Sequence, residues 1–253
     1  MGYQNILTSI QGRVGIITMN RPDKLNAMTP KMDYEIRAQI AAWNVNSSIG
    51  AIVLTGNGRG FCSGADISRF ETSSEDHGGQ SEMADDNNTP LMANENWIDV
   101  IKTAKPVVAA INGVAVGEGL TRTLPCDVRI ASETAQLSFR FLRVGLTPEF
   151  ASTHYAVYLI GLGRTLELML TGELISAAEA FRIGLVNHIC PADELLEKAT
   201  KIATSIADNP SWNLSQVKRL VHKNYPTHNI ETILSDENRT FANARASNAH
   251  REA

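Results

Sequence analysis

Cysteine is scarce in this chain, and the few that occur form no recognisable set. Cys62, Cys126 and Cys190 are odd in number and widely separated. Disulfide frameworks and structural zinc sites use paired or closely spaced cysteines. The sequence therefore predicts no disulfide framework and no metal site, and a reducing cytoplasm is the compartment that we expect.

An excess of basic residues and a long apolar run are also missing. The 253 residues carry 23 Lys and Arg against 27 Asp and Glu, a formal net charge of −4. Proteins that bind nucleic acid usually show a basic excess or stripe, and a membrane helix needs about 20 apolar residues in a row. We expect no nucleic-acid partner and no membrane insertion. The first residues show no basic and apolar leader, although a removed transit peptide would leave no trace.

What the chain does contain is a regular alternation of strand and helix patterns over its first two thirds. Thr29-Pro30 is a helix start whose apolar residues recur at helical spacing up to Trp43. β-branched runs predict strands at Ile6–Ile10, Val14–Met19, Ala51–Thr55, Val107–Ile111, Asp127–Ala131 and Ala135–Phe139. Beyond Gly163 the patterns are helical. We expect an α/β core over residues 1–190 and a helical region over residues 191–253.

Two of the expected strands run directly into glycine-rich turns. Pro106–Ile111 leads into Asn112–Gly119, and Ala51–Thr55 leads into Gly56–Ile67. Glycine lets a backbone approach a ligand closely, and the first N–H groups of a following helix lack partners inside the helix. Two such units could together hold a negatively charged oxygen.

The segment from Arg69 to Pro90 is rich in acidic and small polar residues. It cannot bury enough apolar surface to order itself cheaply. Two interpretations of this segment are open: a loop at the mouth of a binding pocket, and a surface loop without function.

Four motifs follow one another along the chain: Asn20–Ala27, Phe61–Asp66, Ala110–Gly117 and Cys126–Ala131. In these motifs and their order the chain resembles the crotonase superfamily, also called the enoyl-CoA hydratase/isomerase family. The resemblance implies an α/β fold with a spiral core of repeated ββα units and a helical C-terminal region that joins subunits. It further implies an enzyme of fatty acid metabolism that acts as a homotrimer or hexamer.

The resemblance also implies a site for an acyl-CoA thioester. The backbone N–H groups of Ala65 and Glu118 would form an oxyanion hole for the thioester oxygen. Coenzyme A belongs to the substrate, so no separate cofactor is expected. The substrate-binding residues implied by the motifs are Lys24, Leu25, Ala27, Ser63, Gly64, Asp66, Ile67 and Gly117.

This chain departs from the hydratases of the family at three positions. Glu118 stands where they usually carry glycine, and its side chain either turns outward on the first helical turn or takes part in catalysis. Thr121 and Phe141 occupy the positions of the two hydratase glutamates. Ordinary hydratase chemistry is therefore disfavoured.

Glu149 remains as a candidate base, at the position used by Δ3,Δ2-enoyl-CoA isomerases of the family. Moving a double bond from C3 to C2 needs one group that removes a proton at C2 and returns it at C4. Thr147-Pro148-Glu149 predicts a helix start, whose N-terminus would oppose any rise in the pKa of Glu149 caused by the phenylalanines nearby. Hydration, thioester hydrolysis by Glu118 or Glu149 with water, and a non-catalytic acyl-CoA-binding or RNA-binding role are the alternatives.

Overall fold

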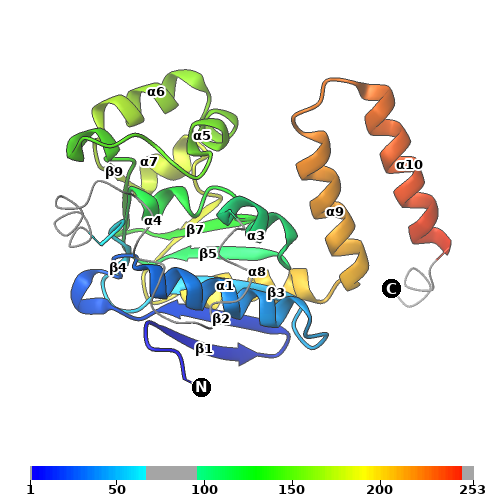
Figure 1. The fold of residues 1–253 in the computed structure, drawn as a ribbon, viewed down its shortest axis with the longest axis horizontal. Coiled ribbons are helices and arrows are strands. Elements are labelled where there is room, and N and C mark those ends of the chain that lie inside the picture. The colour runs from blue at the N-terminus through cyan, green and yellow to red at the C-terminus, as the bar shows by residue number, and fades with distance from the viewer. Residues whose placement is uncertain (1, 67–95, 247–253) are drawn as a thin grey trace, which may run out of the picture.

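The computed structural model describes residues 2–66 and 96–246 (Figure 1). A six-stranded sheet with the order β1-β2-β3-β5-β7-β10 forms its centre. β1 and β2 are antiparallel, and every other neighbouring pair is parallel. The strands are β1 Ile6–Gln11, β2 Val14–Met19, β3 Ala51–Gly56, β5 Val107–Ile111, β7 Val128–Ser132 and β10 His188–Cys190.

A second sheet of four short strands has the order β4-β6-β8-β9. Its members are β4 Gly60–Cys62, β6 Val114–Val116, β8 Gln136–Ser138 and β9 Ile175–Ser176. Along the chain, β4, β6 and β8 follow β3, β5 and β7 respectively. Each successive winding of the spiral therefore adds one strand to each sheet. This repetition confirms the predicted α/β fold with its spiral of paired strands.

Helices cover both faces of the six-stranded sheet. α1 (Pro30–Asn44) begins at Thr29, whose side chain accepts a hydrogen bond from the Met32 N–H as predicted. Its residues Met32, Ile36 and Ile40 belong to the larger hydrophobic core, with Trp97 and Leu54. α8 (Leu195–Ala207) packs on the other face through small side chains, Ala199, Ala203 and Ala207.

The C-terminal helices α9 (Ser211–Asn224) and α10 (Ile230–Ala246) stand apart from this body as a hairpin (Figure 1). Lys218 on α9 is buried, and its Nζ lies 2.7 Å from Oδ2 of Asp127, which fastens the hairpin to the turn before β7. Since α8 packs on the sheet, the projecting part of the helical region is α9 and α10. The predicted division at residue 190 stays a prediction.

One predicted helix starts later than expected. The Thr147-Pro148-Glu149 segment is not helical, and α5 runs over Ser152–Ile160. Phe150 and Ala151 have positive φ angles of 52° and 50°, which an α-helix cannot include. The remaining short elements are η1 Pro22–Lys24, α3 Trp97–Thr103, α4 Glu118–Thr121, η3 Phe141–Val144, α6 Leu162–Thr171 and α7 Ala177–Arg182. Within the described residues, no helix is long and apolar enough to cross a membrane.

Candidate active site

The two glycine-rich turns lie side by side because the strands before them are partners. β4 and β6 are parallel, with Gly60 opposite Val114 and Cys62 opposite Ala115. A Cβ added to Gly119 would stand 2.1 Å from the carbonyl oxygen of Cys62. The two chain segments therefore touch backbone to backbone just beyond the carboxyl ends of their strands.

The N–H of Ala65 points away from the segment that pairs with it. Met28 N donates to Gly64 O at 2.8 Å, and Asp66 N donates to Met28 O at 2.9 Å. Backbone groups alternate in direction along an extended chain, so the N–H of Ala65, between these two, faces the opposite side. Ala65 itself is half-buried.

The N–H of Glu118 is the first of helix α4 and has no carbonyl partner in that helix. Gly117, directly before it, has φ 54° and ψ −121°, a backbone conformation that favours glycine and that turns the chain from β6 into α4. Neither this N–H nor that of Ala65 donates a backbone hydrogen bond within residues 2–66 and 96–246. Two donors at the ends of neighbouring strands are suited to bind one anionic oxygen.

The side chain of Glu118 does not turn outward, and that expectation was wrong. The residue is 8% exposed, and its Oε1 accepts hydrogen bonds from Nε and Nη2 of Arg122 at 2.8 and 2.6 Å. Arg122 is the residue directly after α4 and follows Glu118 by four positions, so one helical turn brings the two side chains together. The carboxylate is held by an ion pair inside the protein rather than by solvent.

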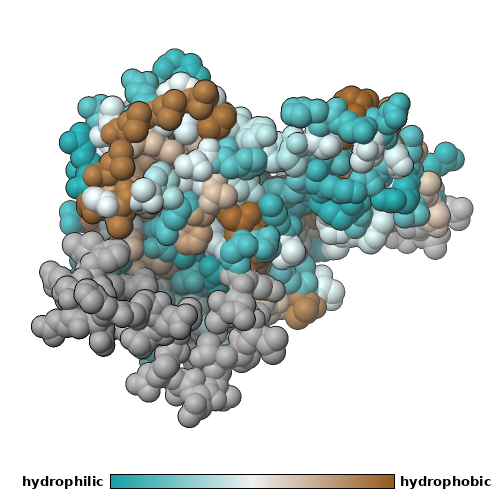
Figure 2. Space-filling view, turned by 45° about the horizontal axis from the view of Figure 1, so that its top comes forward, coloured by the Kyte–Doolittle hydropathy of each residue, from teal (hydrophilic) through white to brown (hydrophobic). Residues whose placement is uncertain are grey.

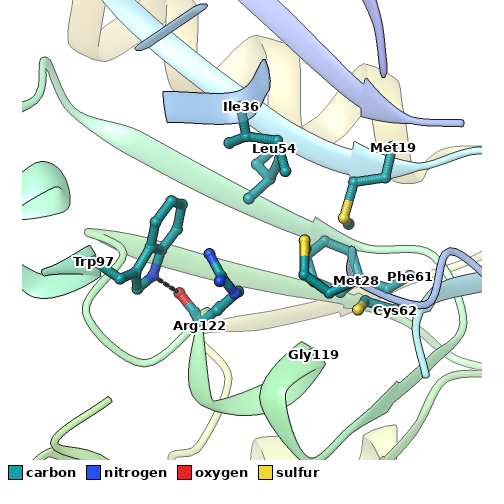
Figure 3. A pocket seen from close by; sticks show the side chains of 9 residues that line it. All are labelled: Met19, Met28, Ile36, Leu54, Phe61, Cys62, Trp97, Gly119 and Arg122. Carbon is teal, nitrogen blue, oxygen red and sulfur yellow. Dashed lines mark hydrogen bonds between the residues drawn. The ribbon is translucent and has the colours of Figure 1, made fainter. Parts of the chain in front are cut away.

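Arg122 is buried between the rings of Trp97 and Phe150 and a second carboxylate, that of Asp33; Figure 3 shows Trp97 beside it. Its Cζ lies 4.8 Å from the ring centre of Trp97 and 4.7 Å from that of Phe150, within cation–π range. Burial alone would lower the pKa of Arg122, but the carboxylates of Asp33 and Glu118 raise it above its ordinary value. The guanidinium therefore stays charged in the protein interior.

The predicted coenzyme A segment around Lys24 is fastened to the glycine-rich turn that follows β3. Asn26 is fully buried, and its amide nitrogen donates to the carbonyls of Asn57 and Gly60 at 3.0 and 2.8 Å. Its Oδ1 accepts from the Arg21 N–H at 2.8 Å. A single buried amide thus sets the position of Lys24 and Leu25 relative to Gly60, where β4 begins.

The side chain of Asp66, which the resemblance assigns to substrate binding, holds the turn in place. Its Oδ2 accepts from Nη2 of Arg21 at 2.9 Å, and Nη1 of Arg21 donates to Ala27 O at 2.6 Å. Ser63 adds a third link, because its N–H donates to Leu25 O at 3.0 Å. Both terminal nitrogens of Arg21 thus take part in this structural role.

The structure brings most of the predicted substrate-binding residues to this region. Lys24 is exposed, Leu25 and Ser63 are half-buried, and Ala27 and Gly64 are buried. Gly64 has φ 106°, and a Cβ there would come within 3.1 Å of Val116 O, so the turn needs glycine. Ile67 and the acidic segment from Arg69 to Pro90 lie outside the described residues.

Glu149 lies exposed in the loop between η3 and α5. The next residue, Phe150, packs its ring against the guanidinium of Arg122, which holds Glu118. At the start of η3, a ring carbon of Phe141 would lie 4.0 Å from a Cβ added to Gly117. The η3 helix and the loop after it thus lie beside the two residues that flank α4, Gly117 and Arg122.

A small cavity of about 10 Å³, enough for roughly one water molecule, lies behind the two turns (Figure 3). Its walls include Cys62, Gly119, Trp97 and Arg122. Burial raises the pKa of the Cys62 thiol to about 11, so this sulfur is protonated at neutral pH and is no nucleophile. In the part of the chain that the structure describes, no group of three or more His, Cys, Asp or Glu side chains could hold a metal ion.

Sequence reasoning missed the partners of Glu118. Arg122 follows Glu118 by four residues, a spacing that signals an ion pair on a helix, but α4 is a single turn and its pattern is weak. Asp33 and Trp97 come from distant helices, α1 and α3, so no local pattern connects them to the site.

A spiral of paired strands, with two glycine-rich turns in backbone contact, defines the α/β fold class of this protein. The chain belongs to the enoyl-CoA hydratase/isomerase family, whose sequence profile it matches over residues 9–253. A probable mitochondrial enoyl-CoA hydratase of Dictyostelium discoideum is 34% identical over 218 residues, covering 86% of this chain and 75% of that protein.

Solved structures of similar proteins share the fold over nearly the whole chain. An enoyl-CoA hydratase subunit of Geobacillus kaustophilus is 32% identical, covers 99% of this chain and 93% of its own, and superposes with a TM-score of 0.85. A monofunctional enoyl-CoA isomerase of M. smegmatis is 29% identical. The match covers 91% of this chain and 98% of that one, with a TM-score of 0.74. The family thus includes relatives named for both reactions.

Proposed function

We propose that this protein is a Δ3,Δ2-enoyl-CoA isomerase with Glu149 as its proton shuttle. The observation that carries the proposal is the identity of two buried residues, Thr121 and Phe141. They stand where hydratases of the family place their two glutamates, and neither side chain can activate water or protonate carbon as a carboxylic acid does. Glu149 lies on a loop attached to the same α4 segment.

The proposed reaction uses the two backbone donors and one carboxylate. The thioester oxygen accepts hydrogen bonds from the N–H groups of Ala65 and Glu118, and Glu149 removes a proton from C2 of a 3-enoyl-CoA. Charge then moves onto the oxygen as an enolate, which the fixed donors stabilise by about 3–4 kcal/mol each. Glu149 returns the proton at C4, and the double bond ends between C2 and C3.

The name of the Dictyostelium relative favours a second candidate, hydration of a 2-enoyl-CoA. In this chain a water molecule would then need Glu149 or Glu118 as its base. Glu118 is less suited, because Arg122 donates two hydrogen bonds to the same carboxylate oxygen and so occupies it. Thioester hydrolysis makes the same demand on these residues.

Ultraviolet absorbance separates these candidates in one experiment. An isomerase converts a non-conjugated 3-enoyl-CoA into the conjugated 2-enoyl-CoA, so the absorbance of the conjugated thioester rises. A hydratase removes this absorbance from a 2-enoyl-CoA, and a thioesterase releases free coenzyme A thiol from either. Loss of conjugated absorbance without any gain from the 3-enoyl substrate would contradict the proposal.

We also propose that the coenzyme A moiety lies along the segments that flank Gly60. The exposed ammonium of Lys24 is available for a phosphate, and the turn from Ser63 to Asp66 runs beside it through the Ser63–Leu25 hydrogen bond. The proposal includes Leu25, Ala27, Gly64, Ile67 and Gly117 as further contacts. It requires no cofactor and no nucleic-acid partner.

We also propose that the protein forms a homotrimer or hexamer in the cytoplasm. Figure 2 has a hydrophobic band over the region of α6, where Leu162, Leu166 and Leu170 are 62%, 49% and 65% exposed. Apolar patches of this kind are typical of surfaces that a partner covers. A second copy of the chain is the proposed partner, and Leu166→Glu should reduce the mass measured by sedimentation equilibrium. An unchanged mass would contradict this interface.

A further inference from the structure

Glu118 places an acid on the residue whose N–H is proposed to hold the enolate oxygen. A negative carboxylate near a developing negative charge raises the energy of the enolate, and the interaction is strong where water is excluded. Glycine at this position would supply the same N–H without the acid. A chain with glutamate here therefore needs something that neutralises the carboxylate.

Arg122 supplies the opposite charge at short distance. Its Nε and Nη2 donate to a single oxygen of Glu118 at 2.8 and 2.6 Å, and both side chains are less than 10% exposed. Hydrogen bonds between charged groups are roughly twice as strong as those between neutral groups. The pair thus fixes where the carboxylate lies and removes most of its net charge.

The guanidinium cannot easily swing away from Glu118. Its Nη1 donates to Oδ1 of Asp33, and the rings of Trp97 and Phe150 pack against it. The backbone oxygen of Arg122 accepts a hydrogen bond from Nε1 of Trp97 at 2.9 Å (Figure 3).

Asp33 in turn accepts from Nε of Arg37 at 2.7 Å, so positive and negative groups alternate along the line Glu118, Arg122, Asp33, Arg37. Their formal charges sum to zero. The alternation reaches from α4 to α1, and Arg122 connects the carboxylates of Glu118 and Asp33.

We propose that Arg122 is a positioning residue for the oxyanion site, which holds and neutralises the Glu118 carboxylate so that the Glu118 N–H can polarise a thioester carbonyl. The inference rests on the proposed acyl-CoA site but not on the isomerase reaction. It predicts that Arg122 matters only while residue 118 carries an acid. Removal of both charges together should then be less harmful than removal of the arginine alone.

The test uses a bound 2,4-dienoyl-CoA, whose ultraviolet band moves to longer wavelength when its carbonyl oxygen is polarised. Wild type, Glu118→Gly, Arg122→Leu and the double variant Glu118→Gly/Arg122→Leu are compared at saturating protein, with urea unfolding as a check on folding. We expect a shift in wild type, Glu118→Gly and the double variant, and its loss in Arg122→Leu. Turnover of Arg122→Leu should fall roughly a hundredfold, as for an impaired oxyanion donor.

Two results would overturn the inference. One is a wild-type shift in folded Arg122→Leu, because the carboxylate would then need no neutralisation. The other is a double variant with a much smaller shift than Glu118→Gly, because Arg122 would then act without the acid; this comparison remains valid even where Arg122→Leu does not fold. A wild-type shift without conversion of a 3-enoyl-CoA contradicts the isomerase proposal alone, because the probe needs no proton transfer.

Discussion

A Cβ atom added to Gly119 would lie only 2.1 Å from the carbonyl oxygen of Cys62. Helix α4 therefore rests directly on the backbone that leads to Ala65. This contact couples the two proposed oxyanion donors, because any displacement of α4 from β4 separates the N–H of Glu118 from that of Ala65.

Gly119→Ala should force the two turns apart. Real Cβ atoms do not come this close to another atom, so the backbone must shift, at a cost of about 2 kcal/mol or more in the free energy of unfolding. Gly163→Ala on α6 is the matched control, since a Cβ there meets nothing within 4 Å and alanine favours a helix. Urea unfolding measures both, and equal stability of the two variants would contradict the close contact.

Asn26→Ala should loosen the coenzyme A segment. The change removes the partner of the Asn57 and Gly60 carbonyls and of the Arg21 N–H, although Asn112 still donates to Gly60 O, and losses of this kind cost about 1–3 kcal/mol each where the group is buried and stays unsatisfied. We expect a loss of at least 2 kcal/mol in the free energy of unfolding together with weaker acyl-CoA binding. Asn57→Ala, at an exposed side chain, is the control. A stable Asn26→Ala protein with normal affinity would refute this role.

The fold was largely predictable, because its information is local. β-branched runs gave the strands of the larger sheet except β10, and the Thr29-Pro30 start of α1 is confirmed by the hydrogen bond from Met32 N–H to Thr29. The short strands β4, β6, β9 and β10 were missed, since two or three residues carry too little pattern. The start of α5 was placed too early because its sequence resembles a helix start, whereas Phe150 takes a positive φ and packs against Arg122.

The candidate site was predictable only where the chain itself defines it. Strand ends and glycines predicted two turns that could hold an anionic oxygen, and the resemblance to the family assigned the donors to the N–H groups of Ala65 and Glu118. The direction of the Glu118 side chain was predicted wrongly, because it depends on Arg122 and, beyond it, on Asp33 and Trp97, which come from other helices. Charge pairing between distant elements leaves no local pattern to read.

The stability of the protein should fall at high pH, in part because of Cys62. Burial raises the pKa of this thiol from 9.0 to about 11, so the unfolded chain loses the proton before the folded protein does. The contribution is fully present below pH 9 and is lost as the pH rises through about 11. A difference of this size corresponds to about 3 kcal/mol in the free energy of unfolding.

Urea unfolding at pH 8 and pH 10.5 measures this loss in wild type and in Cys62→Ala. The variant should lose less stability between the two pH values, and a residual dependence should remain because burial also raises the pKa of Cys126. The same loss in both proteins would show that Cys62 ionises normally in the folded state.

The proposed mechanism depends most on Glu149, and its replacement by glutamine is the most direct test. Conversion of a 3-enoyl-CoA to the conjugated product is measured for wild type, Glu149→Gln and the control Glu167→Gln, an exposed acid on α6. We predict a loss of about a thousandfold or more in rate for Glu149→Gln, with unchanged binding of a 2,4-dienoyl-CoA, and a wild-type rate for the control. A wild type that converts no chain length, or a Glu149→Gln variant as fast as wild type, would contradict the proposal.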